Sequence, residues 1–85
     1  AEAVKIYERA LALDERNAIL HYLLADTLLK IPASDERKIQ KHLERSAALD
    51  EKLAQARLTL GKFYARAEKW RQAAVEFEQA ARNAP

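Results

Sequence analysis

Apolar side chains recur every three or four residues along most of this chain, which is the spacing of one face of a helix. No stretch alternates apolar and polar residues in the way that a half-buried strand does. Polar or proline-containing stretches interrupt the pattern at four places and divide it into five segments. The pattern therefore predicts an all-α protein with helices at residues 2–13, 18–31, 36–49, 52–67 and 70–83.

The residues between these segments are of the kinds that end and begin helices. Pro32 cannot continue a helix and disfavours the helical conformation of the residue before it, so we expect the second helix to end at Ile31. Asn17 suits the N-cap of the second helix, and either Ser34 or Asp35 suits that of the third.

The same periodicity assigns an inward face to each helix. On the first helix we expect this face to hold Ala3, Ile6, Tyr7, Ala10 and Leu13. On the second we expect His21, Leu24, Ala25 and Leu28, and on the fourth Leu53, Leu60 and Tyr64.

A short phrase returns three times: a small or apolar residue, then an aromatic residue or leucine four positions on, then a small residue three positions later. The three copies begin at Ala3, Ile39 and Ala73, which are 36 and then 34 residues apart. A fixed period in the thirties is typical of stacked helical repeats. Corresponding positions in successive helices lie 17 residues apart, except that Leu24 and Leu43 lie 19 apart. We therefore expect two extra residues in the turn at 31–35.

These phrases resemble the tetratricopeptide repeat, whose pattern is W-x2-L-G-x2-Y, then A-x3-F, then A and P. The clearest match is Leu60-Gly61-x2-Tyr64 followed by Ala73-x3-Phe77, Ala80 and Pro85. The chain departs from the pattern at four places, namely His21 and Arg57 in place of the leading tryptophan, Ile39 in place of a small residue and Glu51 in place of the proline.

The resemblance implies a right-handed α-solenoid of antiparallel helix pairs, with about two and a half repeats forming one domain over residues 1–85. Residues 1–17 would be the second helix of a truncated repeat. Residues 18–53 would be a full repeat with the two-residue turn insertion, and residues 54–85 a nearly full repeat. Since the chain begins without Met and midway through a repeat, we expect it to be a fragment of a longer protein.

Composition and charge narrow the classes of function. Fifteen Lys and Arg face thirteen Asp and Glu, which gives a net charge of only +2, and no run of like charges suggests a nucleic-acid-binding arm. The chain has no cysteine, so it has neither a disulfide framework nor a thiolate nucleophile. Cysteine usage therefore does not indicate the cellular compartment of the protein. Its apolar stretches are far shorter than the roughly 20 residues that a membrane helix needs, so we expect no membrane insertion.

The resemblance implies that the first helix of each pair lines a concave groove. The residues expected to face this groove are Ile19, Tyr22, Asp26, Leu29 and Lys30 on the second helix, and Gln55, Leu58, Lys62 and Arg66 on the fourth. An apolar floor flanked by cations suits a peptide that carries an acidic side chain or a C-terminal carboxylate. Alternatively, the apolar residues of this face pack on a neighbouring helix and its bases are merely solvated.

One subclass of the family clamps the carboxylate tails of chaperones with Lys, Asn and Arg on the groove helices. This chain has Asp26 where the resemblance calls for Asn, and Gln55 with Thr59 where it calls for Lys and Arg. We therefore expect no clamp of that kind.

Residues of catalytic types are present but lack catalytic spacing. His21 and His42 lie on different predicted helices without metal-ligand spacing, and Ser46 takes a small-residue packing position. Gly61 is alone in a helix, so no glycine-rich loop is available to hold a phosphate. We expect no enzyme, no cofactor and no metal site. Three large aromatic residues, Phe63, Trp70 and Phe77, are expected to pack in the core.

The leading hypothesis is a non-catalytic interaction module that binds a protein or peptide in its concave groove. The first alternative is a structural role, in which exposed terminal helices stack end to end into homo-oligomers. A distant third is RNA binding by a helical repeat, for which the affinity would fall steeply with salt.

Overall fold

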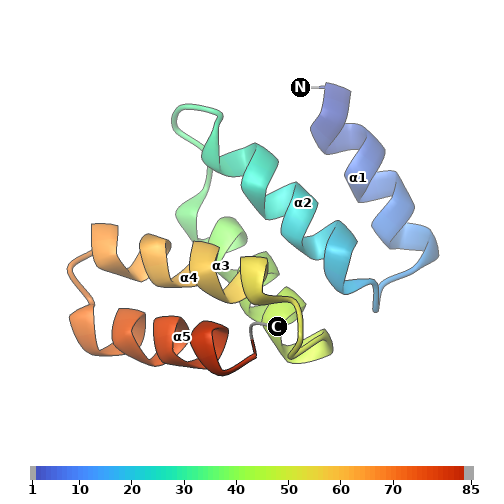
Figure 1. Ribbon diagram of the computed structural model, residues 1–85. Helices are drawn as coiled ribbons and strands as arrows, with labels where there is room; N and C mark the ends of the chain where they lie inside the picture. The colour runs from blue at the N-terminus through green and yellow to red at the C-terminus, as the bar shows by residue number, and fades with distance from the viewer. Residues whose placement is uncertain (1, 84–85) are drawn as a thin grey trace.

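The computed structural model describes residues 2–83 and forms five helices, with no strand among those residues. The helices are α1 (Glu2–Leu13), α2 (Ala18–Leu29), α3 (Glu36–Leu49), α4 (Ala54–Arg66) and α5 (Trp70–Arg82). Consecutive helices run antiparallel, and the closest packing lies within the pairs α2–α3 and α4–α5 (Figure 1). The all-α prediction is confirmed. Pro85, the closing residue of the repeat pattern, lies outside the described residues.

Two predicted helix boundaries are wrong by two residues. The second helix ends at Leu29 rather than Ile31, because Lys30 already serves as its C-cap and Pro32 follows closely. The fourth begins at Ala54 rather than Lys52. The side chain of Asp50 accepts a hydrogen bond from the Lys52 amide at 3.0 Å, which holds that residue in the preceding turn.

Side-chain caps stabilise the starts of α2 and α3. The Asn17 side chain accepts a hydrogen bond from the Leu20 amide at 3.0 Å, as predicted. Of the two candidates for α3, Asp35 is the cap and accepts from the Arg37 amide at 2.9 Å. The Ser34 hydroxyl instead donates to the Ile31 carbonyl at 2.9 Å, and this hydrogen bond stabilises the turn at residues 31–34.

One contiguous core runs through α2, α3 and α4. Leu24, Leu43 and Leu60 are almost completely buried in it, and the predicted inward residues His21, Ala25 and Leu28 are buried with them. The Tyr64 hydroxyl donates to the Glu44 carboxylate at 2.9 Å and thereby joins α4 to α3. Burial, together with this hydrogen bond to Glu44, raises the pKa of Tyr64 to about 12.

The predicted inward face of the first helix is wrong at Ala3, Ile6 and Leu13, which are exposed, whereas Tyr7 and Ala10 are half-buried. The residue of α1 that is buried is Leu11, while Leu13 is 91% exposed and Ile6 is 53% exposed. Val4 and Tyr7 pack partly against the core beside Leu11. Among the described helices α1 packs mainly on α2, so the stripe that faces α2 is covered and Ala3, Ile6 and Leu13 are left exposed.

The expectation that all three large aromatics pack in the core is also wrong. Trp70 is 64% exposed, because it lies at the first position of α5 and α5 packs mainly on α4. Phe77 is partly exposed as well, but one edge of its ring lies against Gly61. Phe63 is half-buried and packs against the core.

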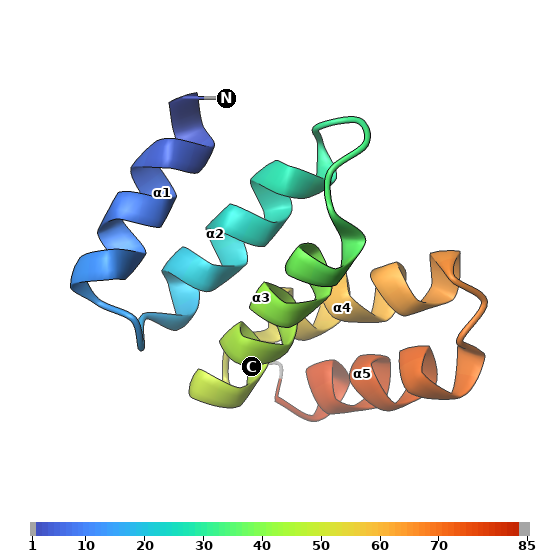
Figure 2. The ribbon, with the colours of Figure 1, turned by 180° about the vertical axis from the view of Figure 1, so that it is seen from behind.

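The helices alternate between two faces of the molecule. In Figure 1 α2 and α4 lie toward the viewer, and from behind, in Figure 2, α3 lies in front of α4. The first helices of the two pairs thus share one face, and any groove common to both must lie there.

Candidate functional site

The C-terminal ends of α2 and α4 form a hollow of about 220 Å³ on their shared face. Its lining comes from the last turns of both helices and consists of Asp26, Leu29, Lys30, Thr59, Lys62, Phe63 and Arg66. Five of these residues belong to the groove predicted from the sequence, namely Asp26, Leu29, Lys30, Lys62 and Arg66. The structure therefore brings the C-terminal part of the predicted groove together.

The remaining four predicted residues lie nearer the N-terminal ends of the two helices and do not line the hollow. Ile19 is 56% exposed, and Gln55 is exposed as well. Leu58 is half-buried, and Tyr22 is half-buried against the core. These side chains lie on the same faces of α2 and α4, outside the hollow.

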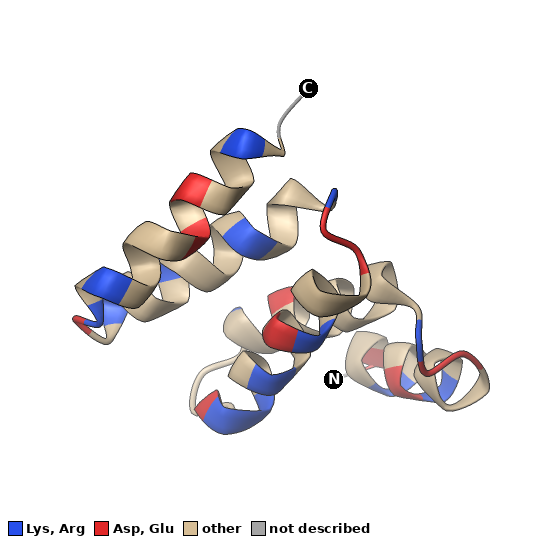
Figure 3. Cartoon of the chain, turned by 90° about the horizontal axis from the view of Figure 1, so that it is seen from below, with Lys and Arg blue, Asp and Glu red and all other residues tan. Residues whose placement is uncertain are grey.

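Charge on this face is predominantly positive. Although Lys and Arg are interspersed with Asp and Glu over the chain as a whole (Figure 3), α4 carries three bases and no acid. The Arg57 Nη1 atom lies 3.1 Å from the Glu76 carboxylate, and the Lys30 Nζ atom lies 3.3 Å from that of Asp26. Within residues 2–83, no carboxylate lies within ion-pairing distance of Lys62 or Arg66. Their charges are available to an anion.

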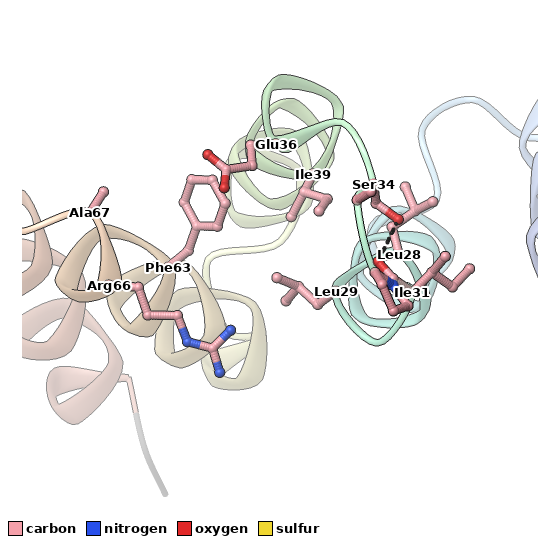
Figure 4. A pocket seen from close by; sticks show the side chains of 11 residues that line it. Leu28, Leu29, Ile31, Ser34, Glu36, Ile39, Phe63, Arg66 and Ala67 are labelled. Carbon is pink, nitrogen blue, oxygen red and sulfur yellow. Dashed lines mark hydrogen bonds between the residues drawn. The ribbon is translucent and has the colours of Figure 1, made fainter.

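A second, larger cleft of about 320 Å³ adjoins the first at the turn between α2 and α3. Most of its lining residues are apolar, although polar atoms contribute nearly half of its exposed surface. The lining residues are Leu28, Leu29, Ile31, Pro32, Ala33, Ser34, Glu36, Ile39, Phe63, Arg66 and Ala67. In Figure 4 Phe63, Leu29 and Ile39 surround its centre. The two hollows share Leu29, Phe63 and Arg66, and so adjoin each other.

Sequence reasoning did not place this second cleft. The periodicity correctly located an irregular turn at residues 31–35, but a period cannot show which way a turn folds. Phe63 was assigned to the core, where it does pack in part, and its exposed edge is what both hollows share. The signal that was available is the length of the connection, since six residues separate α2 from α3 and three separate α4 from α5.

The two histidines were expected to be packing or surface residues, and the structure joins them. The Nδ1 atoms of His21 and His42 lie 2.9 Å apart, and the His21 Nε2 atom lies 2.8 Å from the backbone carbonyl oxygen of Glu15. Because a carbonyl only accepts, His21 Nε2 carries a hydrogen, and a neutral His21 then accepts from His42 at Nδ1. Burial, and next the neighbouring His21, lower the pKa of His42.

Other candidate chemistry is absent from the described residues. Within residues 2–83, no group of three or more His, Cys, Asp or Glu side chains could hold a metal ion. The Ser46 hydroxyl is fully buried and donates to the Ala18 carbonyl at 2.7 Å, which fits the predicted packing role. None of the described helices has the length and apolar character that crossing a membrane requires.

Comparison with solved structures identifies the fold. The chain is similar to the second TPR of Spaghetti (RPAP3) bound to the HSP90 peptide SRMEEVD, with a TM-score of 0.87 and 26% sequence identity. The match covers 99% of this chain and 71% of the other. No family model matches the chain, and a search of curated proteins finds no match. The chain thus has the right-handed helical-repeat fold of a tetratricopeptide repeat domain, as its sequence pattern predicts.

Proposed function

We propose that this chain is a non-catalytic interaction module, which binds an acidic peptide segment of a partner protein on the shared face of α2 and α4. The observation that carries the proposal is the hollow at the C-terminal ends of these helices, where Lys62 and Arg66 flank apolar surface without a described acidic partner. A concave surface lined by apolar side chains with a few convergent polar groups is typical of ligand sites.

The structural relative supports the class of ligand. Its peptide, SRMEEVD, contains three acidic residues and one basic residue, so an anionic segment is bound by a domain of the same fold. The positions at which we expect a chaperone-tail clamp hold Asp26, Gln55 and Thr59 in this chain. We therefore propose an acidic peptide as the ligand, and make no assignment to a chaperone.

The proposal is tested by selection from a library of random heptapeptides with free C-termini, followed by fluorescence anisotropy on the selected peptides. We expect acidic sequences to be enriched. The double variant Lys62→Glu/Arg66→Glu should weaken their binding by about tenfold or more, because two rim attractions become repulsions. The matched control is Lys41→Glu/Arg45→Glu, which reverses two exposed charges at the same spacing on α3 and should leave affinity unchanged.

Two results would contradict the proposal. One is that no peptide is enriched by the folded domain. The other is that both double variants weaken binding equally, since the effect would then come from net charge and not from this face.

A second candidate function, end-to-end self-association, has one observation in its favour. Large apolar side chains are exposed on both outer helices: Ile6 and Leu13 on α1 and Val75 on α5. Sedimentation velocity across a hundredfold range of concentration tests this candidate. A sedimentation coefficient that stays at the monomer value would exclude it.

A further inference from the structure

The apolar cleft at the α2–α3 turn carries an inference beyond general peptide binding. Its volume of about 320 Å³ lies at the lower end of the range of ligand pockets, which is roughly 300–1,000 Å³. The floor consists of the buried side chains Leu28 and Ile39, and the sides include Leu29 and Phe63, both half-buried. Binding in such a cavity is favoured chiefly by the transfer of an apolar group of the ligand out of water.

The wall that the turn contributes is held in place by the turn's own hydrogen bonds. The Ile31 amide donates to the Leu28 carbonyl at 3.1 Å, and the Ser34 hydroxyl donates to the Ile31 carbonyl at 2.9 Å (Figure 4). Ala33 has a φ of 62°, a left-handed conformation that a residue with a Cβ atom seldom adopts. The cleft is therefore formed before any ligand arrives.

The chemistry of the cleft differs from that of the neighbouring hollow. Its one polar turn side chain, Ser34, is already satisfied by the Ile31 carbonyl, whereas Glu36 and Arg66 are exposed on its rim. Arg66 also borders the first hollow, where Lys62 adds a second cation. The cleft thus offers an apolar floor to an apolar side chain, and the adjoining hollow offers two cations to a carboxylate.

We infer that the cleft at the α2–α3 turn receives one large apolar side chain of the bound peptide, and that this residue lies within a few positions of the acidic residue that meets Lys62 and Arg66. The inference rests on the proposed function and defines the partner further, as a segment in which an apolar residue and an acidic residue occur at a fixed short spacing. The turn that builds one wall of the cleft is six residues long, whereas the corresponding turn at 67–69 has three residues.

The test is a double-mutant cycle between the cleft and the peptide. Ala67 lines the cleft, is exposed and caps α4, so Ala67→Phe fills the cavity without entering the core. Ala12→Phe, at an exposed position on α1, is the matched control. Circular dichroism and thermal melting confirm that each variant is folded.

The probes are the heptapeptides selected as described above, each compared with a copy in which its apolar residue is replaced by alanine. For the unmodified domain and for the control variant Ala12→Phe, we expect this replacement to weaken binding by roughly ten- to a hundredfold, the effect of burying one large apolar side chain. For Ala67→Phe we expect the replacement to have little effect, while the preference for acidic residues persists.

The outcomes distinguish this inference from the proposed function. If the selected peptides share acidic residues but no apolar position at a fixed spacing, the cleft is not used and the acidic-peptide function stands. If the alanine replacement costs the same in Ala67→Phe as in the unmodified domain, the apolar side chain binds elsewhere and the inference is wrong. If no peptide is selected at all, the proposed function fails, and the inference fails with it.

Discussion

The two helix pairs, α2–α3 and α4–α5, carry different side chains at corresponding positions of the repeat. Positions 36 apart in the first helices and 34 apart in the second helices match, so His21 corresponds to Arg57 and His42 to Glu76. In the first pair the two side chains share a hydrogen bond between imidazole nitrogens at 2.9 Å. In the second they form an ion pair at 3.1 Å. The same two positions therefore hold a pair of imidazoles in the first helix pair and a guanidinium with a carboxylate in the second.

A second correspondence concerns size. Ala25 and Leu43 in the first pair match Gly61 and Phe77 in the second. A Cβ atom placed on Gly61 would lie 2.6 Å from the Phe77 ring, which is too close for any real contact. The larger side chain of the second pair thus requires the smaller residue opposite, because the distance between the helices changes less readily than the side chains.

A third correspondence concerns the helix starts. Asn17 and Asp35 cap α2 and α3 with their side chains, and the matching residues Leu53 and Lys69 make no side-chain cap bond. The first pair is better capped, and the second holds an ion pair. The two pairs are therefore stabilised by different interactions. Substitutions that move an interaction from one pair to the other test the comparison.

The largest effect is expected from Leu43→Phe, which places the ring of the second pair into the fully buried site of the first. We expect a loss of about 2–3 kcal/mol in the free energy of unfolding, because Ala25 leaves no space for the ring. Urea denaturation measures it. Adding Ala25→Gly should recover part of the loss beyond the effect of Ala25→Gly alone, and strict additivity would show that the two sites are not opposed.

The next effect concerns the ion pair. Arg57→Leu leaves the Glu76 carboxylate, whose side chain is 16% exposed, without its partner. We expect a loss of about 2 kcal/mol, reduced from the value for a fully buried pair because water still reaches the site. The double variant Arg57→Leu/Glu76→Leu should recover most of the loss. A double variant as unstable as the single one would mean that packing, and not charge, is what Arg57 supplies.

A smaller effect is expected from pH, and it should be confined to the first pair. The groups that face His42 are His21 on α2, Glu8 on α1 and the neighbouring Lys38 and Lys41 on α3. Because burial lowers the pKa of His42, the folded state binds fewer protons than the unfolded state below the unperturbed value of about 6.5. The stabilisation is therefore complete above that pH and is lost as the pH falls toward the folded-state pKa.

The measurement is urea denaturation at intervals between pH 7.5 and pH 5. The variant His42→Gln keeps a donor for the Nδ1 atom of His21 but does not titrate, so its stability should change less over this range. The ion pair of Glu8 with Lys38, 2.8 Å in length, lowers the pKa of Glu8, so that carboxylate titrates below this window. Parallel curves for the two proteins would exclude His42 as the titrating group.

The smallest effect is a gain. Lys69→Asp gives α5 the kind of cap that Asp35 gives α3 at the corresponding position, and Lys69 is exposed, so nothing is unpacked. We expect the free energy of unfolding to rise by about 0.5–1 kcal/mol. Thermal melting measures it, with Lys69→Asn as the control that separates the cap from the charge. No gain in either variant would indicate that the backbone at residue 69 does not adopt a capping geometry.

Particular residues show which parts of the fold and of the candidate site could be predicted from the sequence. Leu24 and Leu60 were expected in the core, and Leu43 belongs to the repeated phrase. All three are among the most buried large side chains of the core, because residues that recur at the helical period lie on the face that packs. The inward face of α1 was wrong at Ala3, Ile6 and Leu13, because among the described helices α1 packs mainly on α2, which leaves these residues uncovered. Five of nine groove residues share one hollow, yet the cleft beside it was not foreseen.

The sequence by itself determined the five helices, their pairing and the tetratricopeptide-like fold, because helix periodicity and repeat spacing are properties of order along the chain. Only the tertiary structure decided which side chains meet: the two histidines, 21 residues apart and without any motif, and the apolar cleft beside the cations of α4. Contacts of this kind depend on the direction in which each turn folds and on how closely helices approach. Spacing along the chain does not encode either quantity.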